Sequence, residues 1–325
     1  MARNNKQITG TLAKEYCKKF ETAPTHEIAR ALFQDHPEVF KSKEHARSSV
    51  RYYRGQNGKK QRERIEVIIP KVVIPKADKQ IDWTPFVIDT SPACFIGDIH
   101  LPYHDERVLD LFFDNCAKIG AKTIGFMGDS LDCYQLSKWQ KNPKFRDFPS
   151  EIRMFKDLLE SVHKAFPDAL IVVKEGNHEE RYERYLCDHA PALFGLEQIT
   201  LHSLLEADRP WLEYVSDKRV ITTKKLNIIH GHEYPFAISN PVNPARGLYT
   251  RAKKNSMCFH FHQTSEHSET AINGDLTTCW SVGCGCQLHP AFAPLNKWNH
   301  GFADVFSEGD NFTVHNYRIL NGKVL

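Results

Sequence analysis

Long apolar runs are missing from this 325-residue sequence. No stretch approaches the ~18 consecutive apolar residues that a membrane-spanning helix needs, so the composition excludes a membrane-embedded protein. The first residues, MARNNKQITGTLAKEY, also lack the apolar core of a signal peptide, which argues against export. We therefore expect a cytoplasmic protein with no membrane partner.

A disulfide framework is missing as well. The nine cysteines are scattered along the chain and odd in number, which favours a reduced compartment and excludes a disulfide-stapled scaffold. We find no internal repeat and no low-complexity tract. The content of 41% hydrophobic and 26% charged residues is typical of a globular protein, and the length suits one large domain plus a smaller one.

Net charge is low but unevenly distributed. Residues 1–65 carry 15 Lys and Arg against 7 Asp and Glu, a net charge of +8, whereas the remainder carries 28 against 33, a net charge of −5. A basic head on a mildly acidic body indicates two modules. The head could contact a polyanion such as nucleic acid, or it could simply present a solvated basic face.

Three short helices are expected in the first 55 residues. The first, residues 8–22, has apolar side chains at spacings of four: Leu12, Tyr16 and Phe20. Thr25 is the expected N-cap of the second helix, and Ser42 that of a third helix ending at Gly55. The end of the third helix is basic, with Arg47, Arg51 and Arg54. This pattern is consistent with a helix-turn-helix module or with a small bundle that docks on the body or another subunit.

Short runs of valine and isoleucine interrupted by Pro70 and Pro75 indicate a connector after these helices. We therefore predict a basic helical module at residues 1–65, a linker at 66–90 and a single domain at 91–325. In that domain β-rich runs alternate with helical stretches. The runs are ACFI (93–96), KTIGFM (122–127), ALIVVK (169–174), LNIIH (226–230) and SMCF (256–259), and the clearest helices are 108–120 and 151–166. This alternation is typical of an α/β fold with buried strands.

Polar side chains follow each of these five strands. The strand ends read GDIH from Gly97, GDSLD from Gly128, GNHE from Gly176, HGH from His230 and HFH from His260. In α/β sheets, ligands gather at the carboxyl ends of the strands, so these side chains are expected to meet. The histidines His260 and His262 also sit two residues apart, and in extended backbone they would point the same way.

The residue types suit a pair of divalent metal ions. Carboxylate, amide oxygen and imidazole together favour manganese, iron, zinc or related ions, and the lack of cysteine in these motifs argues against a structural zinc site. The glycines before Asp98, Asp129 and Asn177 allow the chain to turn sharply as it leaves the sheet.

GDIH, GDSLD, GNHE, HGH and the HFH pair, in this order, resemble the calcineurin-like metallophosphoesterase family over residues 91–265. The tail CWSVGCGCQLHPAFAPLNKWNHGFADV and the N-terminal helices are similar to phage and prophage members, which would place the protein in the host cytoplasm if a phage encodes it. The resemblance implies a four-layer α/β/β/α sandwich beside the small all-α module. It departs from the family at Phe259, where glycine usually precedes the first histidine. Either the loop is shifted or the ring fills space beside the metals.

The resemblance also implies a role for each motif residue. Asp98, His100 and His262 would hold one metal ion, and Asn177, His230 and His260 the other. Asp129 would bridge the two ions. His178 would face the substrate as an acid or as a hydrogen-bond donor to phosphate, oriented by Asp132. Manganese is the expected ion, with iron, zinc or nickel as alternatives.

The expected activity is hydrolysis of phosphate esters by a hydroxide that bridges two metal ions. Phosphodiester bonds of nucleic acid or nucleotides are the preferred substrate, which would make the enzyme a phosphodiesterase or nuclease. A phosphomonoesterase acting on phosphoprotein or a small ester is the alternative within enzymes. A DNA-binding protein with a catalytically idle body, or a head that serves oligomerisation, are the alternatives from other classes.

Several nearby residues have an open assignment. His232 could support the metal ligands or be exposed, and Tyr103, His104 and Arg181 could touch substrate or serve the surface or a helix end. His267 is expected on the surface, and Cys284 and Cys286 are expected to be buried thiols. The aromatic residues from Trp298 to Phe302 are expected to pack in the core rather than to stack on a nucleotide.

Overall fold

The computed structural model describes residues 2–57, 73–77, 83–139, 147–234 and 242–325. The chain forms two compact units, Met1–Lys79 and Gln80–Leu325. No helix in the described ranges is both long enough and apolar enough to cross a membrane. All nine cysteines lie in these ranges and are free thiols.

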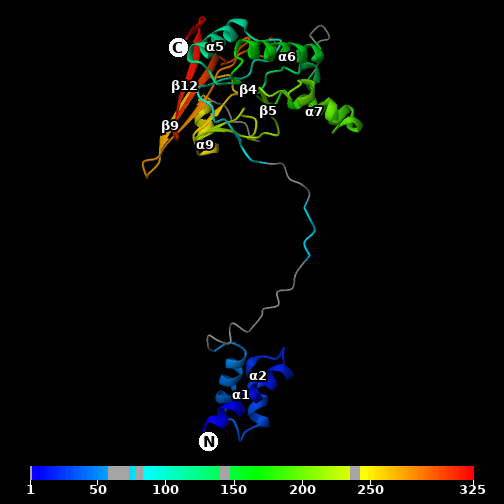
Figure 1. Ribbon diagram of the computed structural model, residues 1–325, viewed down its shortest axis with the longest axis vertical. Helices are drawn as coiled ribbons and strands as arrows, with labels where there is room; N and C mark the ends of the chain where they lie inside the picture. The colour runs from blue at the N-terminus through cyan, green and yellow to red at the C-terminus, as the bar shows by residue number, and fades with distance from the viewer. Residues whose placement is uncertain (1, 58–72, 78–82, 140–146, 235–241) are drawn as a thin grey trace. The chain divides into compact units, whose positions relative to one another are not determined.

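The N-terminal unit consists of three helices, α1 (Ala2–Lys19), α2 (Thr25–Asp35) and α3 (Lys43–Tyr53), drawn in blue in Figure 1. They enclose a small core of their own, which includes Ala13, Ile28, Leu32, Phe40 and Val50. The prediction of three helices is therefore confirmed.

The two predicted N-caps of this unit have different outcomes. Ser42 caps α3 as predicted, because its side chain accepts a hydrogen bond from the backbone N–H of His45. The prediction that Thr25 caps α2 is wrong. Pro24 holds the N-cap position in an extended conformation, and Thr25 is the first helical residue. The Thr25 hydroxyl instead accepts a hydrogen bond from Arg54 at 3.2 Å.

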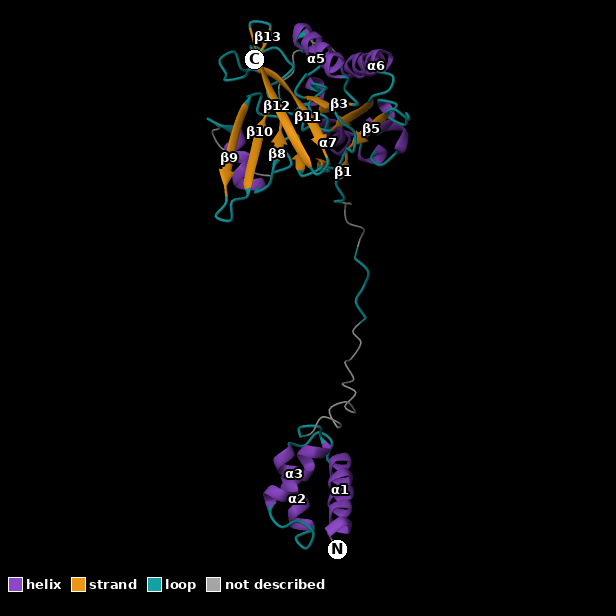
Figure 2. Cartoon of the chain, turned by 60° about the vertical axis from the view of Figure 1, so that its left-hand side comes forward, coloured by secondary structure: helices purple, strands orange, loops and turns teal. Residues whose placement is uncertain are grey.

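The larger unit is built on two β-sheets (Figure 2). The seven-stranded sheet has the order β13 (Lys323–Val324), β12 (Asn311–Leu320), β11 (His300–Glu308), β2 (Ala93–Ile96), β3 (Thr123–Met127), β4 (Leu170–Lys174) and β5 (Leu212–Val215). The six-stranded sheet has the order β1 (Phe86–Val87), β6 (Ile221–Thr223), β7 (Leu226–Ile228), β8 (Ser256–Cys258), β10 (Leu276–Ser281) and β9 (Ser265–Thr270).

Successive side chains of a strand point to opposite faces of the sheet, and both faces of the buried strands are apolar. In β2, Phe95 packs into the core between the two sheets, where it joins residues such as Ile228 and Met257. Its neighbours Cys94 and Ile96 point the other way, toward helices α5 (Glu106–Ile119) and α6 (Phe148–Ala165). Helix α9 (Pro244–Ala252) covers the outer face of the six-stranded sheet. The predicted α/β fold, with two sheets flanked by helices, is confirmed.

The remaining helical segments connect these layers. They are η1 (Tyr134–Leu136), α7 (Glu180–His189), η2 (Pro191–Leu193), η3 (Glu197–Ile199) and α8 (Leu201–Leu204). Helix α5 begins at an aspartate cap, Asp105, and ends at Gly120 in the left-handed region with φ of 65°. These two ends fix the direction in which the chain leaves β2 and enters β3.

The predicted strands correspond closely to β2, β3, β4, β7 and β8. The start of the sheet structure differs from the expected domain boundary at residue 91. Phe86 and Val87 form β1, which pairs in parallel with Ile221 and Thr222 of β6. The first strand of the larger unit therefore begins five residues before the expected boundary. Of the expected linker, residues 66–72 and 78–82 lie outside the described ranges.

Candidate metal centre

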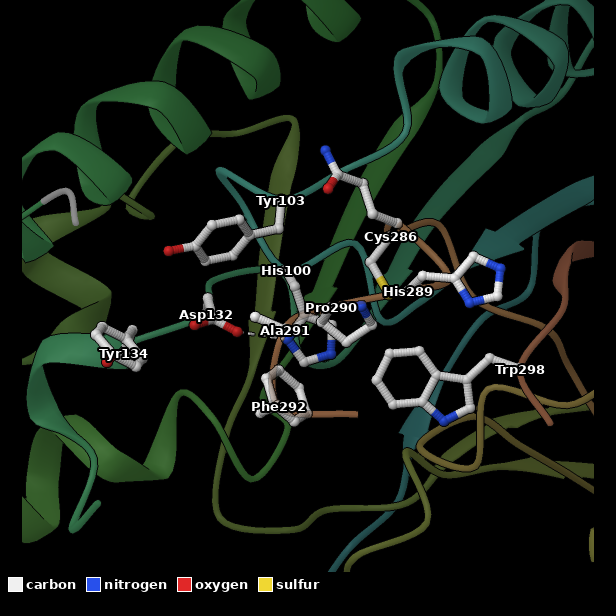
Figure 3. Close-up of a pocket in the computed structure, with 11 residues that line it drawn as sticks. His100, Tyr103, Asp132, Tyr134, Cys286, His289, Pro290, Ala291, Phe292 and Trp298 are labelled. Atoms are coloured by element: carbon white, nitrogen blue, oxygen red, sulfur yellow. Dashed lines mark hydrogen bonds and ion pairs between the residues drawn. The ribbon is translucent and has the colours of Figure 1, made fainter. Parts of the chain in front are cut away.

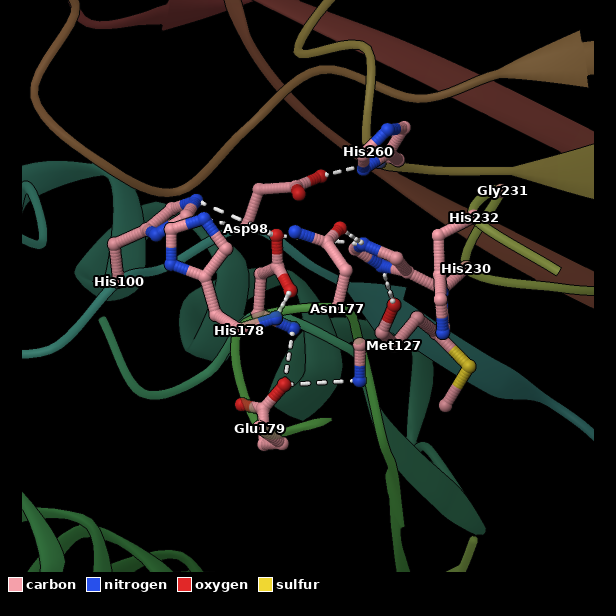
Figure 4. Close-up of polar contacts among 12 residues, drawn as sticks. Asp98, His100, Met127, Asn177, His178, Glu179, His230, Gly231, His232 and His260 are labelled. Carbon is pink, nitrogen blue, oxygen red and sulfur yellow. Dashed lines mark hydrogen bonds and ion pairs between the residues drawn. The ribbon is translucent and has the colours of Figure 1, made fainter. Parts of the chain in front are cut away.

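The five predicted strand ends meet at one place, between the two sheets. β2, β3 and β4 of the seven-stranded sheet carry Asp98, His100, Asp129 and Asn177 in the turns that follow them. β7 and β8 of the six-stranded sheet lead into His230, His260 and His262. The backbone N–H of His260 donates to the Asp98 carboxylate at 2.8 Å, so the two sheets are joined inside the cluster (Figure 4).

One half of the cluster consists of Asp98, His100 and His262. His262 Nε2 lies 3.3 Å from Asp98 Oδ1 and 3.4 Å from His100 Nε2. His100 Nδ1 is 3.1 Å from the Asp132 carboxylate, which fixes the proton on Nδ1 and leaves the Nε2 lone pair facing the other two residues. This geometry suits a metal ion held by two imidazoles and a carboxylate.

The other half consists of Asn177, His230 and His260. His230 Nδ1 donates to the backbone carbonyl of Met127 at 2.9 Å, so Nε2 is the nitrogen that faces inward. His230 Nε2 lies 3.3 Å from Asn177 Oδ1. Ligand atoms of Asp129, His230 and His260 all lie within 4.8 Å of one another.

Asp129 belongs to both halves. One carboxylate oxygen is 3.4 Å from His230 Nε2 and 3.9 Å from His100 Nε2. The other oxygen accepts the backbone N–H of His178 at 2.9 Å, which holds the carboxylate in place. A side chain so placed could contact two ions, as the predicted bridging role requires.

The electrostatics of the cluster are dominated by burial and by carboxylate–imidazole pairs. Burial alone would lower the pKa of His230, yet the adjacent Asp129 carboxylate raises that pKa to about 10. Burial opposes ionisation of Asp129, but His178 and His230 hold the pKa of Asp129 well below its usual range. For His260, burial and then the charge of His230 lower the pKa to about 4. Protons thus compensate the buried carboxylates here, and metal ions would take over that role.

Backbone strain marks the same residues. Asp98, His100, Asp129, His260 and His262 all have φ between 47° and 70°, in the left-handed region that side chains other than glycine seldom adopt. Hydrogen bonds such as that from the N–H of His100 to the carbonyl of Asp129 hold these turns. His260 and His262 follow the last residue of β8 and are not extended, so the alternation of extended backbone does not apply to them. They lie in separate halves of the cluster, which agrees with the division that the resemblance implied.

The donor set fits a pair of divalent metal ions. Asp98 Oδ1 and His260 Nδ1 are buried without a hydrogen-bond partner, and unsatisfied buried polar atoms are costly unless they bind something. Three oxygen-donating residues and four imidazoles match the preferences of manganese, iron and zinc. The structure brings all seven predicted ligands together, and their metal binding stays a prediction.

Phe259 replaces the glycine expected before His260, and the structure shows how it fits. Its ring is fully buried in the core between the sheets. A Cβ atom on Gly97 would come within 2.7 Å of this ring, so the glycine at that position makes room for it. Phe259 itself is outside the positive-φ region, so no glycine is required there. Of the two explanations, the ring that fills space is the one observed.

The two predicted catalytic residues contact each other differently from the expectation. The Asp132 carboxylate lies closer to His100, at 3.1 Å, than to His178, at 3.5 Å. His178 Nδ1 donates instead to the backbone carbonyl of Asp132 at 2.8 Å. Its Nε2 atom faces the cluster, 3.8 Å from Asp129, and is 2.7 Å from an Arg181 guanidinium nitrogen. Asp132 therefore orients His178 through its backbone and His100 through its side chain.

Two buried carboxylates that support the centre had no predicted role. Glu179 accepts the backbone N–H groups of Asp129, Leu131 and Gly176 at 2.9–3.0 Å. Glu233 accepts those of His230 and Gly231 at 2.8 and 2.6 Å. Glu179 is the last residue of the GNHE motif, and Glu233 directly follows HGH. A backbone that leaves a strand has unpaired N–H groups that need acceptors. A glutamate directly at such a strand end was therefore the feature of the sequence from which this role could have been predicted.

Lys174 compensates the negative charge of Glu233. Its ammonium group is completely buried at the end of β4 and lies 3.0 Å from Glu233. Burial would raise the pKa of Glu233, but Lys174 is the first of the cations that lower it, to about 2. A lysine within an apolar strand such as LIVVK requires a partner, so the sequence already indicated a buried ion pair.

Cys284 and Cys286 are buried, in agreement with the expectation. Cys286 is also close to the cluster, because its Sγ atom lies 3.7 Å from His262 Nδ1. The sequence offered no signal for this contact, since 24 residues separate the two.

The other residues with an open assignment fall outside the cluster. His232 contacts Glu180 at 2.8 Å, and His267 contacts Glu269 at 3.2 Å on strand β9. Tyr103 and Trp298 line a pocket next to His100, whereas Phe302 packs in the core. Trp298 and Phe302 therefore have separate roles, although the expectation treated them as one packing segment.

No family model matches the chain. Among curated proteins it is similar to the "Gene 54 protein" of Mycobacterium phage L5, 22% identical over 241 residues that cover 70% of this chain and 93% of the phage protein. The protein of the same name from Mycobacterium phage D29 is 22% identical over 240 residues with the same coverage.

Among solved structures the chain is similar to Vps29 from Entamoeba histolytica in complex with zinc. The TM-score is 0.38 at 12% identity, and the match covers 72% of this chain and 96% of Vps29. It is also similar to the nuclease MPE of Pseudomonas putida, with a TM-score of 0.32 at 12% identity, over 66% of this chain and 84% of the nuclease.

Proposed function

We propose that this protein is a di-metal-dependent phosphoesterase that hydrolyses phosphodiester bonds of nucleic acid or nucleotides. The observation that carries the proposal is the convergence of Asp98, His100, Asp129, Asn177, His230, His260 and His262, with Asp129 placed between the two halves. When bound, two metal ions supply a water of lowered pKa and a clamp for phosphoryl oxygens.

The chain's own residues supply the remaining functions. The carboxylates of Glu179 and Glu233 accept hydrogen bonds from backbone N–H groups of the turns that carry the ligands. The ligands are therefore positioned before substrate binds. His178 faces the same space and is placed to give a proton to the departing oxygen once its Nε2 atom is protonated. The Arg181 guanidinium beside it is a cation within reach of phosphate.

The preference for a polymeric substrate rests on a groove next to Asn177. This groove, which we call the cationic groove, has a volume of about 550 Å³ and is lined by Lys138, Trp139, Arg181, Arg184, Tyr185 and Asp188, among others. Three cations face one carboxylate there. The Trp139 ring is 68% exposed, and Lys138 Nζ lies 5.2 Å from its centroid. Cations interleaved with exposed aromatic rings are the chemistry that binds single-stranded nucleic acid.

A substrate panel tests this proposal. We expect purified protein with manganese to cleave a small phosphodiester and single-stranded oligonucleotides, and to cleave monoesters less well. The pair Lys138→Ala and Arg184→Ala is expected to lower kcat/KM for an oligonucleotide roughly tenfold more than for the small diester, and to reduce its salt dependence.

The matched control is the pair Lys118→Ala and Lys225→Ala, which removes two exposed cations from the last turn of α5 and from the β6–β7 turn. Turnover of monoesters without diesters would favour the phosphomonoesterase alternative. No turnover of any ester by metal-loaded protein would leave only the catalytically idle alternative.

We also propose that residues 1–65 contact nucleic acid. The proposal rests on the net charge of +8 and on a groove between α1 and α3 that includes Lys14, His45, Tyr52 and Tyr53. Arg54 does not belong to this surface, because its guanidinium group bonds to the carbonyls of Phe20 and Glu21 within the unit.

Salt-dependent binding tests the head separately from the enzyme. The fragment 1–65 has a core of its own and is expected to bind labelled DNA at low salt, with affinity that falls steeply as salt rises. Lys14→Ala is expected to weaken binding. Lys18→Ala, at an exposed lysine of α1 that does not line the groove, is the charge-matched control and is expected to weaken it less. Absence of binding at low salt contradicts the proposal.

A further inference from the structure

A second pocket lies beside the metal centre, on the side of His100. It has a volume of about 220 Å³ and is lined chiefly by the rings of Tyr103, Tyr134, Phe292 and Trp298, together with Pro290 and Ala291. His100 and Asp132 form part of its wall, so it opens directly onto the cluster. We call it the aromatic pocket. Figure 3 shows Trp298 and Tyr134 on opposite sides of it, with His100 and Asp132 between them.

One aromatic side chain of this pocket, that of Phe292, is not explained by packing. The Phe292 side chain is 79% exposed, although a large apolar ring in water is unfavourable. The Trp298 ring lies 4.1 Å from the His262 ring and 6.2 Å from the Phe292 ring, both measured between centroids. Trp298 thus lies between a proposed metal ligand and an exposed phenylalanine, and a series of tilted aromatic rings leads out from the centre.

The loop that carries these rings is braced internally. The Asn296 amide donates to the carbonyls of Leu288 and Ala293, and its carbonyl oxygen accepts the N–H of Trp298 at 2.9 Å. The N–H of Gln287 donates to the carbonyl of Tyr103, which ties the loop to the turn after β2. These contacts preorganise the pocket, so little ordering is required of it on binding.

We propose that the aromatic pocket binds a nucleobase of the substrate, next to the scissile phosphate. This inference rests on the proposed function. The volume is below the ~300–1,000 Å³ of pockets for drug-sized ligands, so the pocket takes one ring system rather than a whole dinucleotide. Stacking between aromatic side chains suits every base, because each base has a π-face. Gln287 and His289 line the same pocket and supply polar groups for the edge of a base.

The aromatic pocket and the cationic groove together define a path for the substrate across the metal centre. The aromatic pocket includes His100 and Asp132, and the cationic groove includes Asn177 and Arg181. A nucleotide strand with one base in the aromatic pocket would place its next phosphate at the cluster and its continuation among the cations. This arrangement favours a nucleobase over the aryl group of a phosphotyrosine, which needs no such continuation.

Dinucleotides that lack one base provide the test of turnover. The thymidine dinucleotide TpT has two analogues in which one thymidine is replaced by an abasic sugar. We expect the enzyme to cleave TpT about tenfold faster than the analogue that lacks the base bound in the aromatic pocket. Phe292→Ser and Trp298→Leu are expected to remove most of that difference. Leu295→Ser, which changes a 96% exposed residue of the same loop, is expected to preserve it.

A binding measurement without hydrolysis separates this inference from the proposed function. Saturation-transfer NMR on metal-stripped protein is expected to detect 2′-deoxyadenosine, with a signal that Phe292→Ser weakens and Leu295→Ser does not. Binding without any esterase activity would support the pocket and contradict the proposed function. Equal turnover of TpT and its abasic analogues, together with no NMR signal for 2′-deoxyadenosine, would overturn the proposal that this pocket binds a base. Faster turnover of phosphotyrosine than of TpT, with loss in Trp298→Leu, would overturn it in favour of an aryl phosphate.

Discussion

Replacement of Asp129 by asparagine is expected to lower kcat/KM for a phosphodiester by about 10³-fold, which corresponds to ~4 kcal/mol of transition-state stabilisation. Within the part of the chain that the structure describes, Asp129 is the one residue whose carboxylate approaches imidazoles of both halves of the cluster, His230 at 3.4 Å and His100 at 3.9 Å. An amide has the same shape but offers only one oxygen. When that oxygen accepts the N–H of His178, the amide NH2 group replaces the carboxylate oxygen that approaches both imidazoles.

The substitution should leave the fold intact. The Asp129 oxygen that accepts the N–H of His178 is available from an asparagine as well. Removal of the charge also removes the main influence that raises the pKa of His230 to about 10, so this pKa is expected to fall in the metal-free variant. Metal content, thermal stability and the NMR titration of His230 would report these effects separately from activity.

Asp168→Asn is the matched control, because Asp168 is an exposed aspartate between α6 and β4. It should bind two metal ions per chain and retain full activity. An Asp129→Asn protein that kept two ions and its activity would refute the bridging role.

Replacement of His178 by glutamine is expected to lower kcat by ~10²–10⁴-fold, the usual contribution of a general acid. His178 lies at the edge of the cluster, with Nδ1 bound to the carbonyl of Asp132 and Nε2 directed inward. Its Nδ1 proton is therefore committed to the backbone, and only Nε2 is available for the substrate. Arg181 holds that nitrogen in the substrate-free protein and would have to move aside when His178 is protonated.

The leaving group decides whether His178 acts as an acid. p-Nitrophenolate departs without a proton, whereas the alkoxide of a nucleotide needs one. The loss in His178→Gln should thus be much larger for a dinucleotide than for a nitrophenyl diester. His267→Gln, at a histidine on β9 that pairs with Glu269, is the control. Equal losses with both leaving groups would assign His178 to phosphate binding instead of proton transfer.

Local chemistry predicted most of the fold elements. The strands of the centre have apolar sequences, three of them followed by glycine, and the helices between them have amphipathic sequences, so both are visible without tertiary information. Ser42 was recognised as a cap because its preference is local. Thr25 was misassigned because Pro24 can hold the same extended position and the Thr25 hydroxyl has another partner in Arg54, a residue distant in sequence.

The site residues were predictable for a related reason. The polar residues stand directly after strands, and strand ends meet at the edge of a sheet whatever the details of packing. The orientation of His178 was less predictable. Whether it contacts the side chain or the backbone of Asp132 depends on a left-handed turn at Cys133, with φ of 49°, that the sequence does not indicate.

The sequence alone therefore determined the order of the elements, the polar strand ends that converge and the kind of ion they suit, because these follow from residue type and spacing. The choice of seven ligands among these residues came from the resemblance of the motifs to the calcineurin-like metallophosphoesterase family. The resemblance also implied that His260 and His262 divide between two metal ions, and only the tertiary structure decided the geometry that separates them. β7 and β8 belong to a second sheet, so His260 and His262 approach from the opposite side and separate between the two halves. The fit of Phe259 against Gly97 and the pocket around Trp298 depend on contacts between residues far apart in the chain, and no local pattern encodes such contacts.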